Sequence, residues 1–101
     1  MLEVNAANNT ERSVWEIKLA GEIDIANADV LKNQIAESLA EAKQDIELDL
    51  WGLSYIDSTG LGVIMGAYAA AKKDGYSLKL LSPKDNVKKL LNISGLDKII
   101  G

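Results

Sequence analysis

The sequence predicts an α/β fold, a sandwich in which helices pack mainly on one face of a mixed, mostly parallel β-sheet. Two patterns indicate it. Apolar and polar residues alternate in four short segments, with the period of two that is typical of half-buried strands. Between these segments, apolar residues recur at intervals of three and four, which is typical of amphipathic helices. Where a helix joins two such strands, the strands form a parallel, right-handed unit.

The N-terminal half is expected to begin with a β-hairpin. Residues 2–6 alternate between apolar and polar, residues 8–9 are a pair of asparagines suited to a turn, and residues 15–21 alternate again and end at a glycine. A helix follows, and its apolar stripe is Ala28, Leu31, Ile35, Leu39 and Ala42. The next strand is predicted at residues 46–50, where apolar and acidic residues alternate.

The C-terminal half is expected to contain two further helices and a strand. The first helix runs from Ser58 to about Lys73 and stops at Gly75, because glycine commonly ends helices. A strand is predicted at residues 76–80. A third helix is expected to use Ser82 as its N-cap, Pro83 as its first residue and Asp85 to complete a box-like pair, and a last turn buries Leu96, Ile99 and Ile100.

Length and composition indicate a folded globular chain. It has 101 residues, of which 48% are hydrophobic and 26% charged, so we expect residues 1–101 to form one domain. The formal charge of −4 argues against a nucleic-acid partner, since binding phosphates requires clustered Lys and Arg. The N-terminus lacks the basic and apolar regions of a signal peptide, and the longest uncharged segment, 58–71, is too short to span a bilayer. We therefore expect no membrane partner and a cytoplasmic protein.

The residue inventory argues against most enzyme classes. The chain has no Cys and no His, which excludes thiolate catalysis, disulfides, zinc sites of the usual types and imidazole-activated nucleophiles. The glycines at 60, 62 and 66 are one residue off the dinucleotide-binding fingerprint, and no phosphate-binding loop is present. We predict no catalytic residue, no metal site and no cofactor, so the chain is not expected to be an enzyme.

The most informative segment is Tyr55–Gly62, between a predicted strand and helix. Either Asp57 or Ser58 suits the N-cap of that helix. Gly60 and Gly62 lie in its first turn, where glycine costs about 1 kcal/mol relative to alanine. They indicate that something approaches the backbone closely. In the simplest interpretation, the segment shows ordinary helix capping and tight packing, and a neighbouring element approaches the backbone. Otherwise, a ligand or a partner protein approaches it.

Other conspicuous residues have structural interpretations. Trp15 and Trp51 are expected to be packing residues in the core or at its rim. Asp45, Glu47 and Asp49 alternate along one strand, which favours a solvated strand face over a metal site.

Four segments together resemble the STAS domain of bacterial anti-sigma factor antagonists. They are Gly21-Glu22-Ile23-Asp24, the stretch 49–64 with Asp57-Ser58-Thr59-Gly60-Leu61-Gly62 at its centre, the stretch 75–83 and Ile93-Ser94-Gly95-Leu96. The resemblance covers essentially the whole chain, and the Asp-Ser-Thr-Gly-Leu-Gly segment is its most specific part.

This resemblance implies a partner-switching regulator of transcription. In the family, the unmodified antagonist binds an anti-sigma factor, a serine kinase with a histidine-kinase-like ATPase fold, and so frees the sigma factor. The kinase phosphorylates the serine that follows the aspartate, here Ser58, and binding is lost until a PP2C-type phosphatase removes the phosphate. The implied partner surface is Asp24, Asp57, Ser58, Thr59, Gly60, Leu61 and Gly62. Thr59 stands where many members have a second serine, which leaves two candidate hydroxyls.

Alternative functions remain open on the sequence. A STAS protein also serves as a scaffold or accessory protein, in a stressosome or attached to a membrane transport ATPase. Antagonists of this type act in sporulation circuits and in general-stress circuits alike. A small nucleotide-binding enzyme is the alternative from another class, and it would be stabilised against heat by a nucleotide.

Overall fold

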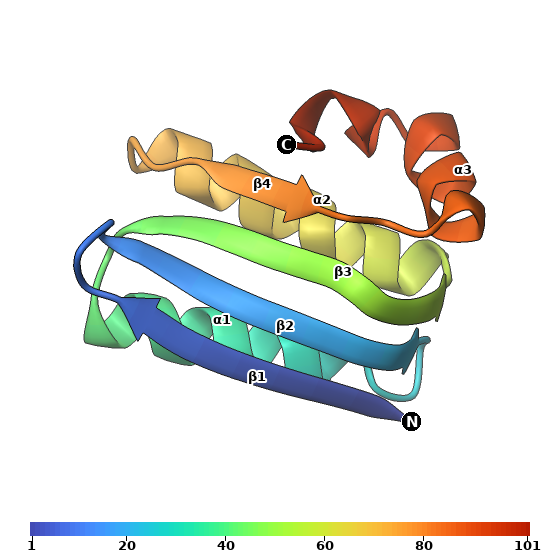
Figure 1. Ribbon diagram of the computed structural model, residues 1–101, viewed down its shortest axis with the longest axis horizontal. Coiled ribbons are helices and arrows are strands. Elements are labelled where there is room, and N and C mark those ends of the chain that lie inside the picture. Colours follow the sequence, from blue (N-terminus) through green and yellow to red (C-terminus); the bar gives the residue numbers. More distant parts are fainter.

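Four strands form one sheet, and two long helices cover one of its faces (Figure 1). The computed structural model describes residues 1–101. The elements are β1 (Leu2–Asn9), β2 (Val14–Ile23), α1 (Ala28–Glu41), β3 (Asp45–Ile56), α2 (Ser58–Lys73), β4 (Leu78–Leu81), α3 (Asp85–Ile93) and the short 3-10 helix η1 (Leu96–Ile99). The strand order is β1-β2-β3-β4, with β1 antiparallel to β2 and the other neighbours parallel. The predicted fold class is confirmed.

The core lies between the sheet and helices α1 and α2. The inner face of the sheet contributes buried Ile17, Leu19, Leu48, Leu50 and Leu80, and the helices contribute Leu31, Ile35 and Ile64. Helix α3 and η1 lie on the β4 side of the sheet (Figure 1) and add Val87, Leu91 and Leu96 to the same core. None of the helices combines the length and the apolar content that crossing a membrane requires.

Strand β3 extends beyond the predicted residues 46–50. The alternation of apolar and polar residues is interrupted after residue 50, so the pattern did not indicate the rest of the strand. In the pairing with β2, Lys18 faces Asp49 and Ala20 faces Gly52, so one residue of β2 opposes two of β3. Such a bulge shifts the buried positions and ends the period of two. The buried residues beyond it are Leu53 and Ile56.

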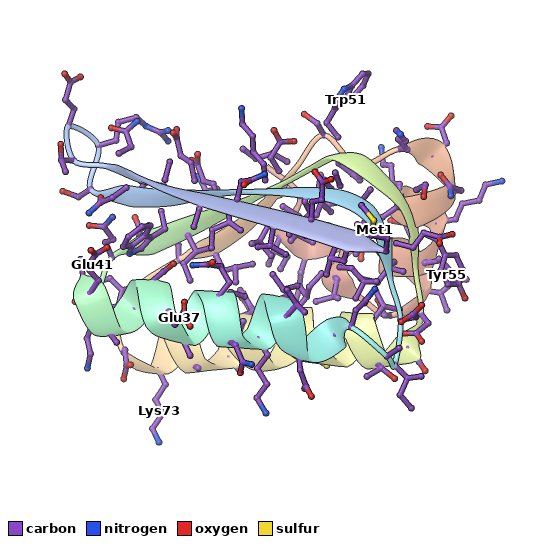
Figure 2. The ribbon with its side chains drawn as sticks, turned by 90° about the horizontal axis from the view of Figure 1, so that it is seen from below. Met1, Glu37, Glu41, Trp51, Tyr55 and Lys73 are labelled. Carbon is purple, nitrogen blue, oxygen red and sulfur yellow. The ribbon has the colours of Figure 1, made fainter.

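The bulge also places Trp51 on the sheet face opposite the helices (Figure 2). Its side chain is 70% exposed, and its amide donates to the Asp49 carboxylate over 3.0 Å. The interpretation of Trp51 as a packing residue is therefore wrong. Trp15 is buried as predicted, and its indole N–H donates to the Ala42 carbonyl over 2.8 Å, which holds the end of α1 against β2.

The hairpin turn follows the two asparagines instead of containing them. Asn8 and Asn9 still pair with β2, and the Asn9 side chain accepts the Arg12 amide and so shapes the turn beyond it. The Arg12 guanidinium then contacts Glu16 and Glu47. The hydrogen bond and the negative charge of Glu47 raise the pKa of Arg12. Glu47 thus joins the turn to β3, and its side chain is largely covered.

Two boundaries in the C-terminal half differ from the prediction. The Tyr76 amide still bonds to the Ala71 carbonyl at the end of α2, so β4 begins only at Leu78. Ser82 has a φ of 55°, a left-handed conformation in place of the extended one that an N-cap needs. Helix α3 therefore starts later, with Lys84 as its N-cap, and the predicted roles of Ser82 and Pro83 are wrong.

Candidate functional site

Asp57 is the residue that starts helix α2. Its backbone is extended, one carboxylate oxygen accepts the Gly60 amide over 3.0 Å, and its carbonyl accepts the Leu61 amide over 3.0 Å. Of the two residues that suited the N-cap, Asp57 therefore fills the position. Ser58 becomes the first residue of the helix.

The second carboxylate oxygen of Asp57 reaches a loop far away in the sequence. It accepts the Ile25 amide over 3.0 Å, and the Asp57 amide donates to the Ile23 carbonyl over 3.1 Å. Asp57 thus joins the start of α2 to the loop between β2 and α1. Asp24 belongs to that loop, so the structure brings the two predicted acidic residues to the same end of the sheet.

The loop is held by its own side chains as well. One Asp24 carboxylate oxygen accepts the Ala26 amide over 2.9 Å. The Asn27 side chain accepts the Asp24 amide and donates to the Glu22 carbonyl, each over 2.9 Å. Asp24 therefore shapes the loop. Asn27 was not singled out from the sequence, although its spacing of three from Asp24 is typical of side chains that close turns at helix starts.

The Ser58 and Thr59 side chains are both exposed. Neither hydroxyl takes part in the side-chain hydrogen bonds of this end of the molecule, and neither residue's amide has a backbone acceptor. Unpaired amides are normal at the first turn of a helix and attract anions. Both side chains are thus exposed to solvent beside the unpaired backbone amides of Ser58 and Thr59.

The glycines of the segment have different surroundings. A Cβ on Gly60 would lie 2.6 Å from Ile23 and 2.7 Å from Ile56, both of which are buried. A Cβ on Gly62 would meet nothing within 4 Å. Tight packing therefore explains Gly60, which is buried and offers no side chain to a partner. It does not explain Gly62, which is exposed.

Helices α1 and α2 enclose a shallow apolar groove that begins at the same segment. It has a volume of about 620 Å³, and Thr59 and Gly62 line it together with Ile35, Leu39 and Val63. No pattern in the sequence predicts this groove, because the groove depends on how the two helices are spaced. Tyr55 is 46% exposed at this end of the molecule (Figure 2).

No metal-ligating cluster is present. Nowhere in the chain do three or more carboxylates come together in an arrangement that could hold an ion. Asp45 and Asp49 instead accept the amides of Ser77 and Trp51, over 2.9 and 3.0 Å.

The exposed start of α2 is thus braced by a distant loop at one end of a four-stranded mixed sheet. The chain belongs to the STAS-domain family. The family model described as "Mlab, STAS domain" matches residues 6–101. The resemblance found in the sequence is confirmed.

Individual relatives agree with this assignment. The chain is 42% identical to the anti-sigma-B factor antagonist of Bacillus subtilis, over 98% of this chain and 90% of that protein. It is 28% identical to the anti-sigma-B factor antagonist of Staphylococcus aureus, over 98% and 92%. The fold matches the solved anti-sigma factor antagonist SpoIIAA in its unphosphorylated form, with a TM-score of 0.84 and 24% identity over 98% of this chain and 86% of that one.

Proposed function

We propose that this chain is an anti-sigma factor antagonist controlled by phosphorylation of Ser58. Its unphosphorylated form binds an anti-sigma factor that is also a serine kinase with a histidine-kinase-like ATPase fold, and the bound sigma factor is released. A PP2C-type phosphatase restores the binding form. Residues 1–101 act as one domain, with no cofactor and no catalysis of their own. The observation that carries the proposal is the exposed Ser58 hydroxyl, in a chain 42% identical to a named antagonist over nearly its whole length.

The partner surface in this proposal surrounds Ser58. Thr59 and Gly62 are exposed, Leu61 is half-buried, and Asp57 holds the segment in place. Asp24 and Gly60 contribute by shaping the loop and by allowing the helix to approach the sheet.

A phosphate on Ser58 is compatible with the folded chain. The free amides of Ser58 and Thr59 and the positive end of the α2 dipole favour an anion there. The phosphate adds about −1.5 to −2 charge beside Asp57, in a chain whose net charge is already −4. Burying that charge in an interface opposes binding by desolvation and by repulsion.

The proposed switch requires no refolding. SpoIIAA has been solved in the phosphorylated form as well, and that form matches the fold of this chain with a TM-score of 0.77 and 23% identity. Both forms of that relative therefore share one fold with this chain. Loss of binding then comes from local charge and size at Ser58.

Capture from a lysate of the native host tests the proposal. The baits are the wild-type chain, Ser58→Glu and the control Ser77→Glu, which adds the same charge at an exposed serine beyond the far end of α2. We expect the wild type and Ser77→Glu to recover a serine kinase of the ATPase fold, and Ser58→Glu to recover at most about a tenth as much, which corresponds to about 1.4 kcal/mol.

Two results would contradict the proposal. Equal recovery of the kinase by all three baits would remove Ser58 from the switch. Equal recovery of a different protein, such as a transport ATPase or a large STAS scaffold, would favour the accessory role. Circular dichroism of each bait checks that the fold is intact.

A further inference from the structure

Ile25 is an apolar side chain that the fold holds out in solvent. It lies in the loop between β2 and α1 and is 80% exposed. Met1 and Ile93 are exposed to a similar extent, at 83% and 84%. Single exposed apolar residues are common and need no explanation by themselves. The surroundings of Ile25 distinguish it from the other two.

The backbone that carries Ile25 is fixed at every residue. The amides of residues 24–28 all have acceptors: the Asn27 side chain for Asp24, the Asp57 carboxylate for Ile25, the Asp24 carboxylate for Ala26, and the Asp24 carbonyl for Asn27 and Ala28. These bonds hold the backbone at Ile25, so little backbone conformational entropy remains to be lost on binding.

The hydrogen bond from the Ile25 amide also connects Ile25 with the segment that carries Ser58. The carboxylate that accepts the Ile25 amide is the one that caps α2 at Gly60, and it immediately precedes Ser58. Ile25 and the Ser58 hydroxyl are therefore carried by two segments that share one bracing side chain. Ile25 and Ser58 therefore lie at the same end of the sheet.

We propose that Ile25 is an apolar anchor of the partner surface, inserted into an apolar pocket of the anti-sigma factor, with Asp57 as the positioning residue. The inference rests on the proposed function and deepens it. Anchors of this kind, presented by a fixed backbone and surrounded by polar contacts, contribute most of the affinity of protein interfaces.

The test is a titration against the purified anti-sigma factor of the native host, the kinase that the lysate capture is expected to recover. Removing a buried isoleucine side chain costs about tenfold to hundredfold in affinity, so we expect Ile25→Ser to weaken binding by that factor. Ile25→Leu keeps an apolar side chain of the same volume and is expected to retain most of the affinity. Ile93→Ser is the matched control, equally apolar and exposed on α3, and is expected to bind like the wild type.

The outcomes separate the two claims. If Ile25→Ser binds as tightly as the wild type, or if Ile93→Ser loses as much affinity as Ile25→Ser, the anchor is overturned and the proposed function stands. Failure of the wild-type chain to bind this purified factor would overturn the proposed function, and the anchor with it. Amide exchange of residues 24–28 in Ile25→Ser checks that the loop is intact, since the substituted side chain makes none of its hydrogen bonds.

Discussion

Gly60→Val is expected to destabilise the fold by about 3 kcal/mol, the upper part of the range for overpacked cores. The added side chain would meet Ile23 at 2.6 Å and Ile56 at 2.7 Å, and both are fully buried against the sheet. Both isoleucines belong to the packed core, so a shift of either side chain disturbs its neighbours there. The loss is a large share of the 5–15 kcal/mol that typically stabilises a domain. Urea unfolding of the wild type and the variant measures it.

The matched control is Gly62→Val, two residues further along the same helix. A Cβ there meets nothing within 4 Å, so the only effect is the difference in helix propensity, and we expect a change within about 0.5 kcal/mol. Similar losses at both positions would show that valine disfavours the helix in general. In that case the close approach of Gly60 to the sheet would not be the cause.

Asp57→Ala is expected to destabilise the chain by about 2 kcal/mol, because it removes an N-cap and a second hydrogen bond together. The cap bonds to Gly60 and the second bond to Ile25, each over 3.0 Å. Without the carboxylate, the loop between β2 and α1 loses its attachment to α2. We expect faster amide exchange at Ile25 as well as a lower free energy of unfolding.

Asp57→Asn separates the two bonds. Asparagine caps helices as well as aspartate does, but it has only one acceptor oxygen, so it keeps the bond to Gly60 and loses the bond to Ile25. We expect a free energy of unfolding between those of the wild type and Asp57→Ala, with amide exchange at Ile25 as fast as in Asp57→Ala. Slow exchange at Ile25 in both variants would contradict the bracing role of Asp57.

Regular patterns in the sequence predicted most of the fold. The predicted stripe of α1 is confirmed at Ala28, Leu31 and Ile35, which are buried on one helix face. Leu39 and Ala42 are only partly buried against the core. The boundaries that were wrong depend on single departures from regularity. The bulge before Gly52 breaks the alternation of β3, and the left-handed Ser82 delays the start of α3. Neither departure has a periodic signal.

Of the candidate site too, only some features could be predicted from the sequence. The cap at Asp57 follows from local chemistry, and the importance of Ser58 came from the family resemblance, because an exposed serine at a helix start is otherwise ordinary. The bond between Asp57 and Ile25 joins residues 32 positions apart, so no local pattern contains it. Gly60 and Gly62 carry the same local cost, and only the three-dimensional surroundings distinguish the packed glycine from the exposed one.

We propose that a phosphate on Ser58 controls binding of the anti-sigma factor. The most direct measurement is a calorimetric titration of that factor with the chain before and after full phosphorylation by its kinase, with the modified residue identified by mass spectrometry. We expect one phosphate, on Ser58, and at least about tenfold weaker binding, equivalent to about 1.4 kcal/mol. Ser58→Ala, treated in the same way, is expected to keep its affinity. Equal affinities before and after modification, or a phosphate on Thr59 in place of Ser58, would contradict the account.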